Sequence, residues 1–331
     1  MANALFGAIS GSGTAAASAM GSIIGPIEKD EGYDPNFSAA ANIATAPTGL
    51  LIPPSNVMIT FSLVSGGTSV AALFMAGYIP GALWALACML VVYIYAKKAG
   101  YRSQTKLTGK EKFNAFIQAL PCLLLIIIVI GGIISGVLTA SDGRVVAVVY
   151  SLLLSIYGYK SMKWKDLPEI FRASAEMTGI IIFLIGVSSI MSWVMAFTNI
   201  PTMVSNGLLS ISSNKYVILL MINIILLVVG TFMDMTPATL IFTPIFLPVC
   251  TALGMNTIHF GIMLIFNLCI GTITPPVGTT LFVGVKVGGV KIETVFKHLL
   301  PYFFAIIVVL MLVTYIPQLS LWLPGLMGYV S

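Results

Sequence analysis

The sequence predicts an all-α polytopic membrane protein built from an inverted repeat, and three observations support this fold class. Of the 331 residues, 58% are hydrophobic and 8% are charged, and the mean hydropathy is +1.03. Soluble domains carry about 25% charged residues, so a chain of this composition belongs in a bilayer. The other two observations are a pair of helix-breaking motifs inside apolar segments and the constant offset that separates them.

Apolar segments follow one another along the chain. Most have roughly 20 residues or more, enough to cross the hydrocarbon core, and 145–159 is shorter. They are predicted at 3–27, 37–65, 75–96, 116–138, 145–159, 215–250, 259–287 and 299–323. A polar loop, EKDEGYDPN, separates the first two segments. The stretch 176–213 is interrupted by VSSIMSW and TNIP, so we interpret it as a hairpin that returns to its own side of the membrane.

The charged residues lie mainly in short loops. Loop 97–112 carries six basic residues against the single acid Glu111, which argues for a cytoplasmic loop by the positive-inside rule. The absolute orientation of the chain in the membrane stays open. The net charge of +5 is small and gives no sign of a nucleic-acid partner. The four cysteines are scattered singly through apolar segments, so we expect neither disulfides nor a cysteine-bound metal.

An internal repeat follows from the positions of helix-breaking residues. Pro53 and Pro275 differ by 222 positions (275 minus 53). The same offset pairs Thr14 with Thr236, Pro26 with Pro248, Gly32 with Gly254, Gly49 with Gly271, Pro54 with Pro276, Gly66 with Gly288, Gly67 with Gly289 and Phe74 with Phe296. Apolar residues coincide easily by chance, but glycines and prolines in one register do not. Because an odd number of crossings is expected between the copies, the second copy should be upside down, as in many secondary transporters.

The double prolines lie in the motifs PTGLLIPPSN at 47–56 and CIGTITPPVG at 269–278. Proline has no N–H to donate and clashes with the carbonyl one turn back, so two in a row stop a helix. In lipid the freed backbone groups cost several kcal/mol each unless something binds them. Such a break is tolerated where it lines a cavity, and its oxygen atoms can hold a cation there. The alternative is a plain kink with local Ser/Thr back-bonding, but two breaks in register favour the ion site.

Two Na⁺ sites are therefore expected, one in each copy, because uncharged hard oxygen donors suit Na⁺ better than a transition metal. The first is predicted at Ser10, Ser12, Thr14, Thr45, Thr48 and Gly49. The second is predicted at Thr231, Asp234, Thr236, Gly271 and Thr274. Na⁺ is expected as a coupling ion, with no other cofactor.

Asp234 is set apart from the other acids, which lie in loops or near the ends of spans. It lies deep in an apolar segment, between LLVVGTFM and MTPATLIFTP. A carboxylate at the centre of a membrane helix costs at least about 2.5 kcal/mol and is a functional-site hypothesis by default. The alternative, compatible with the first, is that Asp234 caps the helix that begins at TPATLI.

Four stretches resemble a known family. They are GAISGSGTAAASAMGSIIGPIEKDEGYD, LLIPPSNVMITFSLVSGGTSVAALFMAGYIPG, GTFMDMTPATLIFTPIFLPV and IGTITPPVGTTLFVG, and they are similar to the large membrane subunit of TRAP (tripartite ATP-independent periplasmic) transporters. The resemblance covers essentially the whole chain. It implies a Na⁺-coupled importer of organic acids in the bacterial inner membrane, working as an elevator with a small membrane subunit and a periplasmic substrate-binding protein.

The resemblance also implies a division of the chain. Segments 1–74 and 173–298 would form the mobile transport domain, 75–172 the scaffold and 299–331 a C-terminal transmembrane helix. The segment 176–213 would be a re-entrant hairpin with its tip near Ser188 to Ser192. The substrate region would include Ser55, Asn56, Ser188, Ser189, Ser192 and Asp234. The family implies a further N-terminal part with a first hairpin, which this sequence is expected to lack.

Other classes of protein are weighed against this interpretation. An intramembrane protease would need a serine in a G-x-S-G motif with a histidine, or two intramembrane aspartates; ISGSG does not supply the first and Asp234 has no second aspartate. We therefore expect no enzyme. A passive channel, a self-sufficient Na⁺/dicarboxylate carrier that needs no binding protein, and an inactive fragment of the permease remain as alternatives.

Overall fold

A computed structural model describes residues 2–101, 109–134, 137–138, 140–212 and 214–329. Every regular element in these residues is helical. The chain divides into two compact units, one formed by Met1–Ser103 with Met191–Ser331 and the other by Gln104–Ile190.

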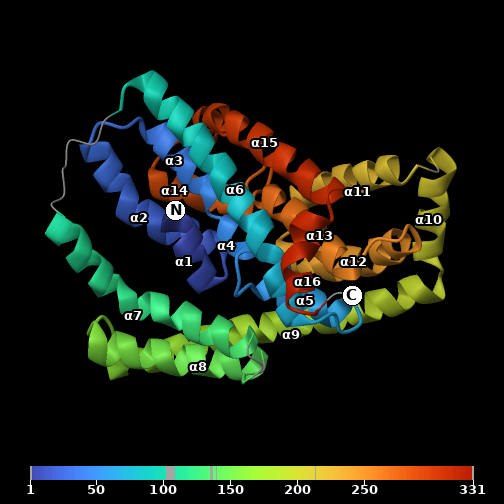
Figure 1. Ribbon diagram of the computed structural model, residues 1–331, viewed down its shortest axis with the longest axis horizontal. Coiled ribbons are helices and arrows are strands. Elements are labelled where there is room, and N and C mark those ends of the chain that lie inside the picture. The colour runs from blue at the N-terminus through green and yellow to red at the C-terminus, as the bar shows by residue number, and fades with distance from the viewer. Residues whose placement is uncertain (1, 102–108, 135–136, 139, 213, 330–331) are drawn as a thin grey trace. The chain divides into compact units, whose positions relative to one another are not determined.

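The larger unit is assembled from two separate runs of helices (Figure 1). The first run consists of α1 (Ala2–Ser10), α2 (Gly13–Asp30), α3 (Pro35–Thr45), α4 (Thr48–Leu51), α5 (Asn56–Val64) and α6 (Val70–Ala99). The second run consists of α10 (Ile200–Ile211), α11 (Lys215–Gly230), α12 (Met235–Ala252), α13 (Thr257–Thr272), α14 (Thr279–Gly288), α15 (Ile292–Tyr315) and α16 (Gln318–Leu326).

The smaller unit contains α7 (Gly109–Ile134) and α8 (Ala140–Leu153), which pack together. The Tyr150 hydroxyl of α8 donates to the Pro121 carbonyl at 2.8 Å, which ties the two helices. A π-helical turn, Leu154–Gly158, and a short 3₁₀ turn, Trp164–Asp166, follow. The helix α9 (Leu167–Phe197) begins in this unit.

The boundaries of the helices follow the offset of 222 residues. The starts of α2 and α12, of α3 and α13, and of α6 and α15 each differ by 222 positions. The caps repeat too, because Asp34 Oδ1 accepts from the backbone N–H of Asn36 and Asn256 Oδ1 accepts from that of Ile258, both at 2.8 Å. The Pro53–Pro54 and Pro275–Pro276 peptide bonds are both cis.

The helices that follow the double prolines pack against the other run. Helix α14 lies against α2 and α3, and α5 lies against α12. The core between the runs includes Trp84 of α6, fully buried, whose indole N–H donates to the Ala44 carbonyl at 2.9 Å. Phe266 of α13 packs on Trp84 with ring centroids 4.8 Å apart. The two runs therefore share one core rather than forming separate bundles.

Several helices have the length and composition of membrane spans. Among the described residues, α6, α12 and α15 are long and apolar enough to cross a bilayer. Pro35–Leu51 and Asn56–Val64 make a fourth span if this pair, bent by 47°, is taken together. Shorter apolar helices include α11, α13 and α14. The all-helical architecture is that of a multi-pass membrane protein, as the composition indicated.

The predicted tip of the 176–213 segment is wrong. Helix α9 continues through Ser188 to Ser192 and ends at Phe197. The chain turns at Thr198 and Asn199, where Asn199 has φ +55°, and α10 starts with Pro201 in its first turn. The stretch VSSIMSW contains no glycine or proline to stop a helix, whereas asparagine tolerates positive φ and proline favours a helix start.

Candidate functional site

The first candidate site begins at the break between α1 and α2. Gly11 has φ +62° and its N–H donates to the Gly7 carbonyl at 2.7 Å, which closes α1. Ser12 is the N-cap of α2, and its Oγ accepts from the Ala15 N–H at 3.3 Å. Ser12 Oγ also lies 3.0 Å from Thr14 Oγ1. The break is thus a short turn rich in hydroxyl and carbonyl oxygens.

The second part of this site is the interrupted segment from α3 to α5. Helix α3 ends at Thr45, α4 is a single turn, and α5 begins only at Asn56, so that Pro53 and Pro54 lie between helices. The Thr48 hydroxyl, fully buried, donates to the Thr45 carbonyl at 2.7 Å. The Thr45 hydroxyl donates to the Ala41 carbonyl at 2.7 Å. Each hydroxyl keeps at least one lone pair that a cation could use.

Glycine lets these two breaks meet. A methyl group on Gly49 would overlap the backbone of Gly7, so α1 and α4 touch backbone to backbone. A methyl on Gly13 would lie 3.7 Å from Pro47 Cα. At Gly11 it would lie 3.4 Å from both the Pro54 carbonyl oxygen and Asn56 Nδ2. The residues predicted for the first Na⁺ site therefore lie on two breaks that touch.

The second candidate site repeats this construction. Helix α11 ends at Gly230 and α12 starts at Met235, with Thr231 and Asp234 as the flanking caps. A methyl on Gly271 would overlap the Gly230 backbone, so the ends of α11 and α13 touch. Beyond the end of α13, the Val277 N–H donates to the Thr231 carbonyl at 3.2 Å. This hydrogen bond directly connects the break after α11 with the break after α13.

The remaining predicted residues of this site differ in their surroundings. Thr274 Oγ1 donates to the Ile270 carbonyl at 2.6 Å, and Thr236 is half-buried in the first turn of α12. Asp234 is exposed and its side chain makes no capping hydrogen bond to α12. The capping alternative for Asp234 is therefore wrong in this structure. Its carboxylate is available to a ligand.

Thr280 is a polar residue at the first break that the sequence analysis missed. It belongs to α14, in the second run, yet its Oγ1 would lie 3.1 Å from a methyl on Gly13. Thr280 is 1% exposed and its hydroxyl has no hydrogen-bond partner among the described residues. Buried hydroxyls are nearly always satisfied, so this one is a candidate ligand. The internal repeat does not point to Thr280, because the equivalent position in the first copy is Met58 (280 minus 222), which has no hydroxyl.

Ser55 and Asn56 of the predicted substrate region lie at the start of α5. The Ser55 hydroxyl is fully buried and has no hydrogen-bond partner in the described part of the chain, whereas Asn56 is exposed. The three serines of α9, at positions 188, 189 and 192, lie inside that helix, and their side chains fall outside what the structure describes. The grouping of these serines with Ser55, Asn56 and Asp234 therefore stays a prediction.

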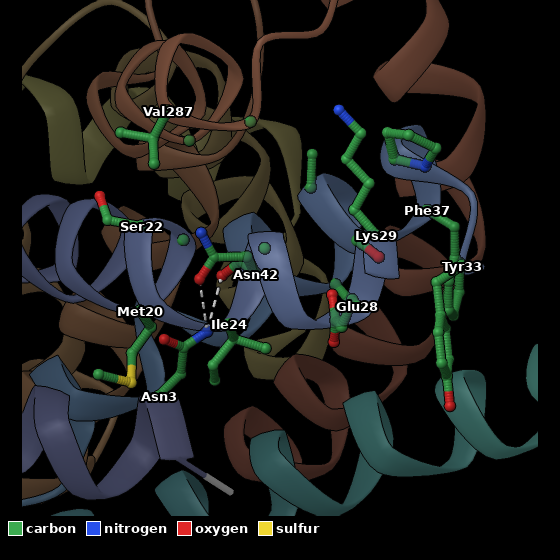
Figure 2. A pocket seen from close by; sticks show the side chains of 18 of the residues that line it. Asn3, Met20, Ser22, Ile24, Glu28, Lys29, Tyr33, Phe37, Asn42 and Val287 are labelled. Carbon is green, nitrogen blue, oxygen red and sulfur yellow. Dashed lines mark hydrogen bonds between the residues drawn. The ribbon is translucent and has the colours of Figure 1, made fainter. Parts of the chain in front are cut away.

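A cavity of about 590 Å³ opens between α1, α2, α3 and α14. Figure 2 shows Asn3 and Asn42 pointing toward one another at its wall. The Asn3 amide donates to Asn42 Oδ1 at 2.9 Å and to Thr45 Oγ1 at 2.6 Å. The cavity therefore reaches Thr45, one of the residues predicted for the first Na⁺ site. Asn3 and Asn42 were not singled out in the sequence, because neither lies in a break motif.

The possible ligand atoms at both breaks are oxygen atoms. Within the described residues, no group of three or more His, Cys, Asp and Glu side chains gathers around a point that could hold a metal ion. The atoms that do gather at the breaks are hydroxyl and backbone carbonyl oxygens, with Asp234 as the carboxylate. Such donors suit a hard cation of low charge. Each break could therefore coordinate an ion through these oxygens, most of which belong to partly buried residues, whereas Asp234 is exposed.

Comparison with known proteins gives consistent matches over almost the whole chain. The family described as "Tripartite ATP-independent periplasmic transporter, DctM component" matches residues 1–319. The protein YgiK of Salmonella typhimurium is 52% identical over 326 residues, which is 98% of this chain and 75% of that protein.

Relatives with named activities match over a similar length. The sialic acid TRAP transporter large permease protein SiaM of Vibrio cholerae is 36% identical over 330 residues, 99% of this chain and 77% of the relative. The C4-dicarboxylate TRAP transporter large permease protein DctM of Pseudomonas aeruginosa is 36% identical over 324 residues, 98% of this chain and 76% of the relative. The resemblance predicted from the break motifs is confirmed, and the chain belongs to the DctM-component family of large permease subunits of tripartite ATP-independent periplasmic transporters.

Proposed function

We propose that this chain is the large permease subunit of a Na⁺-coupled secondary transporter in the bacterial inner membrane. It imports an organic acid that a periplasmic binding protein delivers, together with a small membrane subunit. Relatives are named for C4-dicarboxylate, sialic acid and isethionate transport, and all three substrates are organic acids. The chain carries the ion and substrate pathway and performs no chemical conversion.

The observation that carries this proposal is the pair of glycine contacts at helix breaks, Gly7 with Gly49 and Gly230 with Gly271. Each contact brings two interrupted helices together close to the points where their helical hydrogen-bond pattern ends. In a membrane such groups are tolerated where they line a cavity or bind an ion. A plain kink needs no second broken helix against it, so a pair of breaks favours an ion site.

The two runs of helices are further proposed to be inverted repeats. The helix starts share one offset, and the packing of α5 on α12 matches that of α14 on α2. Cys269 Sγ lies 3.9 Å from the Pro47 carbonyl, and these residues are 222 positions apart. Two equivalent positions can touch only near a pseudo-two-fold axis. Such an axis would place one Na⁺ site on each side of it, and an elevator movement would carry both.

Na⁺ coupling is tested first by uptake. Proteoliposomes containing the chain with its small subunit and binding protein should accumulate a radiolabelled C4-dicarboxylate, sialic acid or isethionate when Na⁺ is outside. Replacing Na⁺ by choline at fixed pH should abolish accumulation. Uptake that persists in choline would rule out Na⁺ coupling, and uptake without the binding protein would identify a self-sufficient carrier instead.

Thr236→Val and Thr274→Val should each raise the Na⁺ concentration that gives half-maximal uptake. Each change replaces a hydroxyl oxygen by a methyl of similar size, and a lost hydrogen bond or ligand of this kind is worth about 1 kcal/mol, or roughly a fivefold shift. Thr251→Val is the matched control, because the Thr251 hydroxyl donates to the Leu247 carbonyl within α12 and lies outside both breaks. Equal Na⁺ dependence in all the variants would support simple kinks.

A further inference from the structure

A groove between α3, α6 and α15 combines an apolar wall with two lysines. It encloses about 270 Å³, and its wall includes Val91, Ile94 and Pro301. Lys98 and Lys297 also line it. Lys98 lies in the last turn of α6 and Lys297 in the second turn of α15. The charged end of the groove is therefore where one apolar helix ends and another begins.

This position is a membrane-surface position, because α6 and α15 both have the length and composition of spans. Aromatic side chains gather at the same end. Phe37 stacks on Tyr95 with ring centroids 3.9 Å apart, and Tyr95 packs edge-on against His298 at 5.8 Å. Amphipathic aromatic rings are enriched at the level of lipid headgroups. The apolar part of the groove should thus face acyl chains and the lysines the headgroups.

The two lysines of the groove, Lys98 and Lys297, have no ion-pair partner among the described side chains. One carboxylate at this end, Asp34, is already engaged: it lies 3.8 Å from His298 Nε2 and accepts from the Asn36 N–H at 2.8 Å. Two ammonium groups beside an apolar groove match a ligand with an anionic head and an apolar tail.

We propose that this groove is a specific site for an anionic phospholipid. The phosphate lies at Lys98 and Lys297, and an acyl chain follows Val91, Ile94 and Pro301. A free phosphate would use only the lysines and leave the apolar wall uncovered. Basic pockets between transmembrane helices bind anionic headgroups.

The test uses the full chain in detergent, titrated with phosphatidylglycerol or with phosphatidylcholine of identical acyl chains. Bound lipid is counted by native mass spectrometry, and the melting temperature is followed in parallel. Wild type should bind phosphatidylglycerol more tightly and gain more thermal stability from it. The double variant Lys98→Gln/Lys297→Gln should bind phosphatidylglycerol on the order of 30-fold more weakly and lose the preference.

The controls separate this site from general charge effects. Lys97→Gln/Lys291→Gln removes the same charge from exposed lysines that do not line the groove, and it should keep the preference. Lys98→Arg/Lys297→Arg should keep it as well. Equal binding of the two lipids to wild type, or equal loss in the Lys97/Lys291 control, would overturn the proposal. Inorganic phosphate should not compete at equimolar concentration; full competition would show an anion site without a lipid.

Discussion

Gly271→Ala is expected to abolish uptake and to lower the melting temperature sharply. A methyl at this position would overlap backbone atoms of Gly230, and a backbone cannot swing aside as a flexible side chain can. Helices α11 and α13 would have to separate, which would also strain the hydrogen bond from Val277 to Thr231. Overpacking of a core costs about 1–3 kcal/mol, occasionally more. Gly49→Ala should act in the same direction, because its methyl would overlap Gly7.

The matched control is Gly25→Ala, within α2. A methyl there would have no neighbour within 4 Å, and alanine stabilises a helix interior by up to about 1 kcal/mol relative to glycine. This variant should therefore melt at or above the wild-type temperature and transport normally. Thermal unfolding in detergent and uptake into proteoliposomes measure both effects. A Gly271→Ala protein that melts and transports like wild type would show that the two helices do not cross as closely as described.

The sequence locates the helix ends well where local chemistry determines them. Proline cannot continue a helix, and α13 ends at Thr272, shortly before Pro275. Asp34 and Asn256 are strong N-cap residues, and α3 and α13 begin directly after them. Composition predicted the membrane class, and the break motifs predicted the family. These features were predictable because each depends on a few neighbouring residues.

The contents of the candidate site were less predictable, because they depend on packing between distant segments. Thr280 reaches the first break only because α14 packs on α2. The motif singles out Ser55, but it does not predict that the buried Ser55 hydroxyl has no hydrogen-bond partner among the described residues. The backbone contact of Gly7 with Gly49 was also not predictable from the sequence. The tip of the 176–213 segment, placed near Ser188 to Ser192 by the family resemblance, is wrong, because no residue there stops a helix and α9 continues to Phe197.

Asp234→Asn is expected to remove most Na⁺-driven uptake while leaving the melting temperature almost unchanged. Asparagine keeps the size and hydrogen-bonding capacity of aspartate and is as good an N-cap residue. The Asp234 side chain makes no capping bond and is exposed beside the break between α11 and α12. Little stability should therefore be lost. Interactions with charged groups are worth about 1.5–3 kcal/mol, so the apparent affinity for Na⁺ should fall roughly 10- to 100-fold.

Asp34→Asn provides the matched control for this change. Asp34 is also an N-cap aspartate, but its carboxylate does cap its helix, accepting from Asn36, and it lies outside both predicted Na⁺ sites. Because asparagine can make the same capping bond, Asp34→Asn should keep the Na⁺ dependence of uptake. Half-maximal Na⁺ concentrations for the two variants and wild type decide the question. If Asp234→Asn transports like wild type, or if both variants are impaired alike, the charge of Asp234 has no specific part in ion binding. A selective loss at Asp234 would place the coupling ion at the second break, where a carboxylate adds to the neutral oxygens.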